Sequence, residues 1–318
     1  MAASTKTSRS LMVWADFLGL ALALAVLVLY FSMTTENFFS VTNLKTIANQ
    51  IPVDLVIAAG MTFVLISGGI DLSVGSMMAL SAAVLGVLLG PSGLPFGVAA
   101  LACLATGLAL GAANASLIAH LGVPSFIVTL GMLEAARGAT FLVTNSQTQY
   151  LGAKIEWVAA EMFWGISAPI LIALVVVALA HVALTHTIFG RSLLALGQNE
   201  EAARLSGIPV KRIRWIVFAV TGLLVGLAGI LHSARLSAVD PNAGLGLELR
   251  AIAAVVIGGT SLSGGRGSIV RSAIGVVLIA VLGSGLAQAG AQEPVKRLVT
   301  GLVIVAAVIL DQFRRRAR

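Results

Sequence analysis

A pair of glycines and a carboxylate interrupt one of the most apolar stretches of this sequence. Gly68, Gly69, Asp71 and Ser73 lie in "LISGGIDLSVGS", residues 65–76, between long apolar runs. Glycine permits backbone conformations that are closed to other residues. A carboxylate in hydrocarbon costs about 3 kcal/mol, and freed backbone groups at membrane depth need protein or water around them. These residues therefore predict a polar passage beside an interrupted helix.

Asp71 also admits a second interpretation. Aspartate is favoured at helix N-termini, so Asp71 can cap the helix that begins just after it. The two roles are compatible, and the sequence does not choose between them. Asn114, between small residues in "GAANAS", suits either a close helix contact or a hydrogen bond toward the passage.

A second glycine-rich break repeats the pattern of the first. Residues 258–265, "GGTSLSGG", share G-G-x-x-L-S-x-G with residues 68–75, and each stretch closes an apolar run. Transporters often contain internal repeats with interrupted helices near the substrate path, so Gly258 and Gly259 join the candidate passage. The alternative is chance recurrence among 34 glycines. Similar local mechanics at the two breaks is expected in either case.

The most polar segment of the chain, residues 186–213, contains a predicted short helix, "NEEAARLSGI". Asn199 can cap it, Glu200 and Glu201 favour its positive N-terminal end, and Gly207 can end it. A short projecting helix suits a groove in a partner protein. The alternative is a helix lying on lipid headgroups, which the two acids disfavour where the lipid is anionic.

Other chemistry is sparse. Glu134 and Arg137 are three residues apart, so on a helix they are expected to pair, and Asp54 is a further acid within an apolar run. The histidines are scattered and Cys103 is the only cysteine, which predicts neither disulfides nor a metal site. With no cluster of acids and histidines, we expect no catalytic residues in this chain.

The elements that must position these residues follow from composition. Of the 318 residues, 58% are hydrophobic and 10% charged, whereas soluble domains carry about 25% charged residues. We therefore predict an all-α integral membrane protein, with one transmembrane domain over residues 1–318. The ten predicted spans are 14–33, 51–67, 73–90, 96–120, 124–145, 164–185, 213–234, 248–262, 269–290 and 297–313.

Charge in the loops predicts the orientation. With the N-terminus inside, thirteen of the 20 lysines and arginines are cytoplasmic, six are outside, and Arg137 lies within a span. This bias predicts ten spans with both termini in the cytoplasm. The net charge of +7 is dispersed among loops without interleaved aromatic residues, so no nucleic acid partner is expected. The outer loop, 146–163, has the spacing of an interfacial helix.

Three stretches carry a resemblance to a known family: "MTFVLISGGIDLSVG" (61–75), "PSFIVTLGMLEAARG" (124–138) and "ELRAIAAVVIGGTSLSGGRG" (248–267). Together with the short helix after Asn199, they resemble the permease subunits of bacterial ABC importers of the ribose type. This family includes permeases for xylose, arabinose, galactose and the furanose-like autoinducer. The resemblance covers nearly the whole chain.

The resemblance implies a dimer of identical or different permeases, each with about ten helices, around a monosaccharide path in the cell inner membrane. A cytoplasmic ATPase would bind the ATP and grip the short helix, and a periplasmic sugar-binding protein would dock outside; no cofactor is expected in this chain. By analogy, Asp71 and its neighbouring glycines lie near the path. The implied ATPase-coupling residues are Glu200, Glu201, Ala202, Ala203, Arg204 and Gly207.

Departures from the family leave the cargo open. Many relatives have an acid in place of Arg250, a glycine in place of Ala115, and a double proline near residues 123–125. A permease for branched-chain amino acids is the nearest alternative, although the paired glycine motifs favour sugar. A stand-alone secondary transporter would need ion-coupling carboxylates at mid-membrane, and this sequence has few.

Overall fold

The computed structural model describes residues 2–163 and 165–316, and these are mostly helical. Each of the ten predicted spans overlaps a helix. Seven helices of the described chain are long and apolar enough to cross a membrane. They are α1 (Ala2–Thr34, apolar over Phe17–Thr34), α2 (Val41–Ile66), α4 (Phe96–His120), α5 (Ser125–Thr144), α6 (Ala168–His186), α9 (Val210–Leu236) and α11 (Ile269–Gln288). The prediction of an all-α membrane protein is confirmed at this level.

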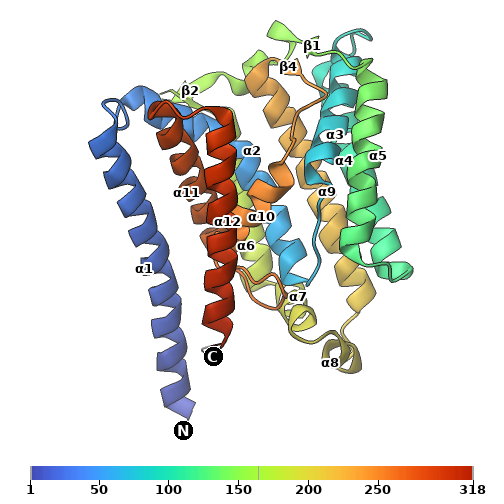
Figure 1. Ribbon diagram of the computed structural model, residues 1–318. Coiled ribbons are helices and arrows are strands. Elements are labelled where there is room, and N and C mark those ends of the chain that lie inside the picture. The colour runs from blue at the N-terminus through green and yellow to red at the C-terminus, as the bar shows by residue number, and fades with distance from the viewer. Residues whose placement is uncertain (1, 164, 317–318) are drawn as a thin grey trace.

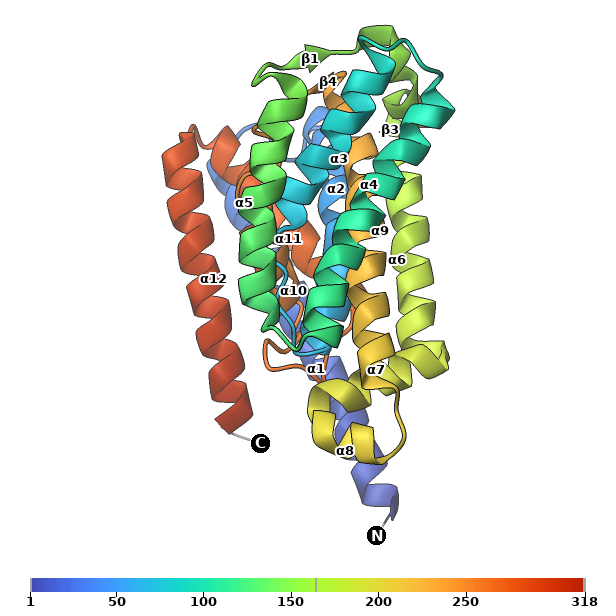
Figure 2. The same cartoon turned by 90° about the vertical axis from the view of Figure 1, so that its right-hand side faces the viewer.

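Among the seven long helices, two lie at the centre of the bundle (Figures 1 and 2). Within their apolar windows, 78% of α2 and 67% of α9 is buried, against 11% for α1. α9 also packs closely on α4, because a side chain at Gly107 or Gly222 would overlap the facing backbone. Small residues allow helices to approach in this way where lipid supplies no hydrophobic driving force. The central pair thus holds the framework on which the interrupted segments rest.

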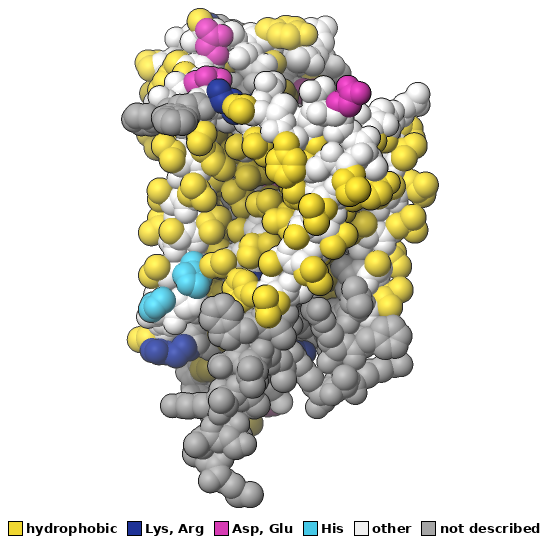
Figure 3. Space-filling view, turned by 90° about the vertical axis from the view of Figure 1, so that its left-hand side faces the viewer, with side chains coloured by type: hydrophobic (Ala, Val, Ile, Leu, Met, Phe, Trp, Pro, Cys, Tyr) yellow, Lys and Arg dark blue, Asp and Glu magenta, His cyan; other side chains and the backbone are white. Residues whose placement is uncertain are grey.

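The peripheral helices present apolar side chains outward. On the face shown in Figure 3, hydrophobic side chains form a broad band, and most of the charged ones lie toward its two ends. Leu18, Leu22 and Leu29 of α1 are each at least 60% exposed. An apolar patch of this extent on a soluble monomer would be unusual. The band is therefore the lipid-facing surface of the protein.

Three of the predicted spans overlap helices outside the set of seven: α3 (Val74–Leu89), α10 (Leu247–Ile257) and α12 (Glu293–Arg316). The predicted span 248–262 was too long, because α10 has 11 residues and is followed by Gly258 as its C-cap. α3 and α10 are each reached by non-helical chain that runs among the helices (Figure 1). Such chain is tolerated at membrane depth only where protein or water surrounds it.

One end of the bundle carries short strands. β1 (Gln149–Tyr150) pairs antiparallel with β4 (Ala238–Val239), and β2 (Glu161–Phe163) pairs with β3 (Ile166–Ser167). The short 3-10 helices η1 (Gly152–Lys154) and η2 (Glu156–Ala159) lie between β1 and β2.

The interfacial α-helix predicted for 146–163 was therefore wrong. The backbone N–H groups of Leu151 and Gly152 donate to the carbonyl oxygen of Ser237, and the side chains of Leu151 and Ile155 are buried. These two N–H groups thus donate to a distant part of the sequence. In an α-helix they would have donated to the carbonyl oxygens four residues earlier.

The opposite end of the bundle carries α7 (Ile188–Gln198) and α8 (Glu200–Leu205). α8 begins and ends within the predicted short helix, whereas α7 was not predicted. Both chain ends lie toward this same end of the molecule (Figures 1 and 2).

Candidate functional site

The helices α2 and α10 end in the same kind of cap. Gly68 follows α2 with φ +78° and Gly259 follows α10 with φ +82°. The N–H of each glycine donates to the carbonyl three residues earlier, and the next N–H donates to the carbonyl five residues before it. A left-handed residue is needed here, which glycine adopts without strain. The expected local similarity of the two breaks is confirmed. The position of the capping residue differs, because Gly68 is the first glycine of its motif and Gly259 is the second of its motif.

After its cap, the first break places Asp71 in a buried hydrogen-bond network. Asp71 is 1% exposed, and its Oδ1 accepts from the backbone N–H of Ser73 at 2.8 Å and from the Ser73 hydroxyl at 2.6 Å. The Ser73 hydroxyl in turn accepts from Nδ2 of Asn114 at 3.0 Å. Charge-assisted hydrogen bonds of this kind offset part of the cost of burying a carboxylate. Asp71 thus organises the turn before α3, while Ser73 occupies the N-cap position.

The two breaks meet each other and the end of α7. The backbone N–H of Gly265 donates to the carbonyl oxygen of Ile66 at 2.9 Å. A Cβ atom at Gly264 would lie 2.8 Å from the Gly197 carbonyl oxygen and 3.0 Å from the Gly68 nitrogen. We refer to this contact as the glycine joint; its members are Ile66, Gly68, Gly197, Gln198, Gly264 and Gly265. It brings together three segments that are distant in the sequence.

A cavity of about 310 Å³ opens beside the first break. Gly68 and Gly69 line it, together with Ser125, Arg214 and Phe218. The Ser125 hydroxyl accepts from the backbone N–H of Ile70 at 3.0 Å. One of the freed backbone groups of the break is therefore satisfied by the start of α5.

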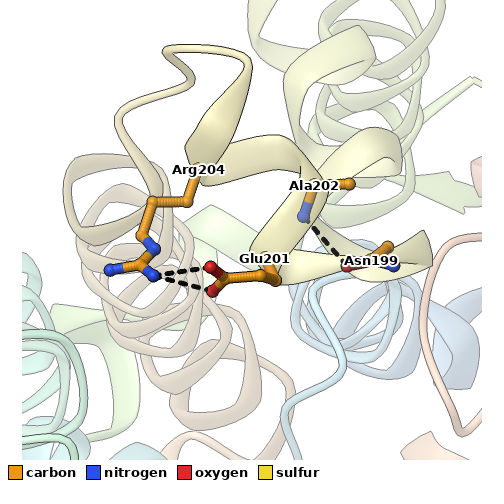
Figure 4. A network of polar contacts seen from close by, with 4 residues as sticks. All are labelled: Asn199, Glu201, Ala202 and Arg204. Atoms are coloured by element: carbon orange, nitrogen blue, oxygen red, sulfur yellow. Dashed lines mark hydrogen bonds and ion pairs between the residues drawn. The ribbon is translucent and has the colours of Figure 1, made fainter.

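The predicted short helix has the expected caps. The Asn199 side chain accepts from the N–H of Ala202 at 3.0 Å, and Glu201 pairs with Arg204 at 2.6 Å (Figure 4). Gly207 has φ +80°. The carboxylate of Glu201 raises the pKa of Arg204, because the ion pair favours the protonated guanidinium. Both of these side chains are more than 60% exposed, so they are free to meet a partner.

The helix is also tied to the bundle. Arg214 of α9 pairs with Glu200 at 2.7 Å, and the Arg214 side chain is only 22% exposed. Ala203, on the inner side of α8, is buried. Of the six predicted coupling residues, four (Glu200, Glu201, Ala202 and Arg204) are exposed side chains of α8, and Gly207 is exposed just after it.

A charged cavity nearer the strand-bearing end was not among the predicted sites. It has a volume of about 120 Å³ and is lined by Asp54 of α2, His232 and Arg235 of α9, and Arg250 of α10. Among the described ion pairs within 4.0 Å, none includes these residues. The charges thus face one another across the cavity. The acid and the arginines were visible in the sequence, but they are almost 200 residues apart, and nothing in their local patterns indicated a shared cavity.

The expected pairing of Glu134 with Arg137 was wrong. Nη1 of Arg137 donates instead to the carbonyl oxygens of Pro241 at 2.7 Å and Ala243 at 2.9 Å, and Glu134 is exposed. The loop between β4 and α10 presents carbonyl oxygens that need a donor, whereas an ion pair with an exposed carboxylate contributes little in water. Arg137 therefore holds that loop in place.

These features define a multi-span membrane protein with interrupted helices, the construction found in membrane transport proteins. Residues 43–308 match the family described as the permease component of the branched-chain amino acid transport system, and the chain belongs to this family.

Several curated proteins are similar over nearly their full length. The ribose import permease protein RbsC of Escherichia coli (strain K12) is 42% identical, covering 91% of this chain and 92% of its own. The D-allose transport system permease protein AlsC of the same organism is 37% identical, covering 98% and 96%. Its xylose transport system permease protein XylH is 33% identical, covering 92% and 91%. The predicted resemblance to ribose-type permeases is confirmed.

Proposed function

We propose that this chain is the permease subunit of an ATP-binding cassette importer that carries a monosaccharide across the cell inner membrane. The observation that carries the proposal is 42% identity to a ribose import permease over 91% of the chain. Relatives named for D-allose and xylose extend the cargo class to monosaccharides. The family description names branched-chain amino acids, but the names of the relatives favour sugar.

The chain crosses the membrane ten times with both termini in the cytoplasm. In this topology α3 and α10 each complete a crossing together with the non-helical chain beside it. Support comes from the position of α8, which lies toward the same end as both chain termini. Because α8 binds the cytoplasmic ATPase in this proposal, the termini at the same end of the bundle also lie in the cytoplasm.

The two partner proteins bind at opposite ends of the bundle. A cytoplasmic ATPase binds ATP and grips α8, where the exposed acids Glu200 and Glu201 are available. A periplasmic sugar-binding protein docks at the end that carries the short strands. A second permease chain completes the path, and this chain itself needs no cofactor.

The sugar path runs beside the two breaks. Its residues are Gly68, Gly69, Asp71, Ser73, Asn114, Gly258 and Gly259. Support comes from the cavity that Gly68 and Gly69 line and from the polar network of Asp71, which has a physical reason to lie near water.

Uptake into vesicles that contain the purified chain tests the function. With the ATPase, the binding protein and ATP present, labelled D-ribose is expected to accumulate, and labelled leucine is not. Omitting the ATPase should abolish uptake. Ribose uptake driven by an ion gradient alone would instead indicate a secondary transporter, and leucine uptake would indicate an amino acid permease.

The role of α8 has its own test. Glu201→Lys reverses a charge on the exposed face of the helix and breaks the contact with Arg204, so co-purification of the ATPase should fall about tenfold. Glu293→Lys, an equally exposed charge reversal at the start of α12, serves as the control and should leave the complex intact. Retained ATPase binding by Glu201→Lys would contradict the docking assignment.

A further inference from the structure

The glycine joint is built from backbone rather than side chains. A Cβ atom at Gly197 would overlap the carbonyl oxygen of Ile66 and the backbone nitrogen of Gly265. Gln198 adds a side-chain contact, with Nε2 3.5 Å from the carbonyl oxygen of Gly265. A side chain can change its rotamer to relieve an overlap, but a backbone cannot. A displacement of one segment must therefore displace the others.

The helix α7 is held in this way at both ends. Near its start, a Cβ atom at Gly190 would overlap the carbonyl oxygen of Leu184, at the end of α6. Near its end, Gly197 enters the joint. The eleven residues of α7 span about 16 Å, so α7 forms a short strut between the end of α6 and the two breaks.

A single residue connects this strut to the projecting helix. The N–H of Asn199 donates to the carbonyl oxygen of Ala195 in α7, while its side chain caps α8 by accepting from the N–H of Ala202. Asn199 is thus bonded into both helices at once. A movement of α8 must therefore reach α7 without being absorbed by a flexible linker.

We propose that Gly197 is a positioning residue for transport: through it, movement of α8 shifts the ends of α2 and of the 258–265 break together. This inference rests on the proposed function, because it takes α8 as the contact with the ATPase. The absence of a side chain at Gly197 is what lets the three backbones touch. Any larger residue would separate α7 from the breaks and uncouple ATP hydrolysis from passage of the cargo.

The test compares Gly197→Ala with Gly131→Ala in the complete importer. Gly131 is also a helical glycine, but a Cβ atom there would meet nothing within 4 Å. For Gly197→Ala, ATP-dependent D-ribose uptake should fall about tenfold, while ATP hydrolysis stays within about twofold of the wild type. Gly131→Ala should change neither. An unchanged ratio of sugar taken up to ATP hydrolysed in Gly197→Ala would overturn the inference.

A second variant keeps the test valid if Gly197→Ala does not fold. Two glycines inserted between Gln198 and Asn199 leave Gly197 and the contacts of the joint in place, but they remove the bond from the Asn199 N–H to Ala195 and separate α7 from α8 by a flexible linker. The amount of sugar taken up per ATP hydrolysed should fall about tenfold in this variant as well. An unchanged ratio would contradict the inference alone. Lack of ATP-dependent uptake by the wild type would contradict the proposed function instead.

Discussion

The glycine joint and the charged cavity both hold segments together inside the bundle, but by opposite means. At the joint, six residues without any ionised group bring three backbones into van der Waals contact. In the cavity, Asp54, Arg235 and Arg250 face one another around about 120 Å³ of space. The first arrangement depends on the absence of side chains, and the second on the presence of long charged ones.

This difference predicts how each region responds to change. Backbone contacts are short-ranged and intolerant, since one added methyl group forces a displacement. Charges across a cavity act over longer distances and are softened by water and salt. The joint is therefore suited to passing on a movement, and the cavity to holding helices together while they shift.

The largest effect is expected at the joint. Gly264 has φ +85° and Gly122 has φ +71°, but only Gly264 is crowded by neighbouring backbone. Gly122→Val should lower the free energy of unfolding by about 1–3 kcal/mol through backbone strain alone. Gly264→Val should lower it by about 1–3 kcal/mol more, because of overlap, and should abolish uptake. Denaturant titration in detergent gives both values, and equal losses would show that the joint is not tightly packed.

An intermediate effect is expected in the cavity. Removing Asp54 leaves two arginines without a counter-charge, and removing Arg235 takes away part of the attraction that Asp54 receives, so Asp54→Asn and Arg235→Gln should each destabilise the protein by about 1–2 kcal/mol. The double variant should be no worse than either single one, which gives a coupling energy of about 1–2 kcal/mol. Thermal unfolding measures the cycle. Glu293→Gln, which removes an exposed ion pair, is the control and should change little; strictly additive losses would show that the two charges do not interact.

The smallest effect is expected at the tether between α8 and α9. Arg214→Gln removes the ion pair with Glu200, in which one partner is half-exposed, and such pairs contribute about 0.5–1 kcal/mol. Amide hydrogen exchange in α8 should speed up by about two- to fivefold. High salt should produce part of the same change in the wild type. Glu201→Gln breaks only a contact within α8 and should change the exchange rates less. A larger effect of Glu201→Gln would show that the ion pair between Glu200 and Arg214 is not what holds α8 to α9.

The local features of the site could be read from the sequence because they depend on neighbouring residues. The capping of α8 by Asn199 and its end near Gly207 follow from preferences at fixed spacings. The glycine-rich end of α2 was expected for the same reason, whereas the predicted span 248–262 ran past the end of α10. By contrast, the partner of Arg137 was mispredicted, since the carbonyls of Pro241 and Ala243 come from more than 100 residues away.

By itself, the sequence determined that this chain is a helical membrane protein with two glycine breaks and a projecting helix, because hydropathy and caps act over one or two turns. Only the tertiary structure decided that the breaks meet at Gly197, that α10 ends after 11 residues, and that Asp54 faces two arginines. The physical reason is that close packing and charge pairing are decided by distances in space. Segments far apart along the chain acquire those distances only when the bundle closes around them.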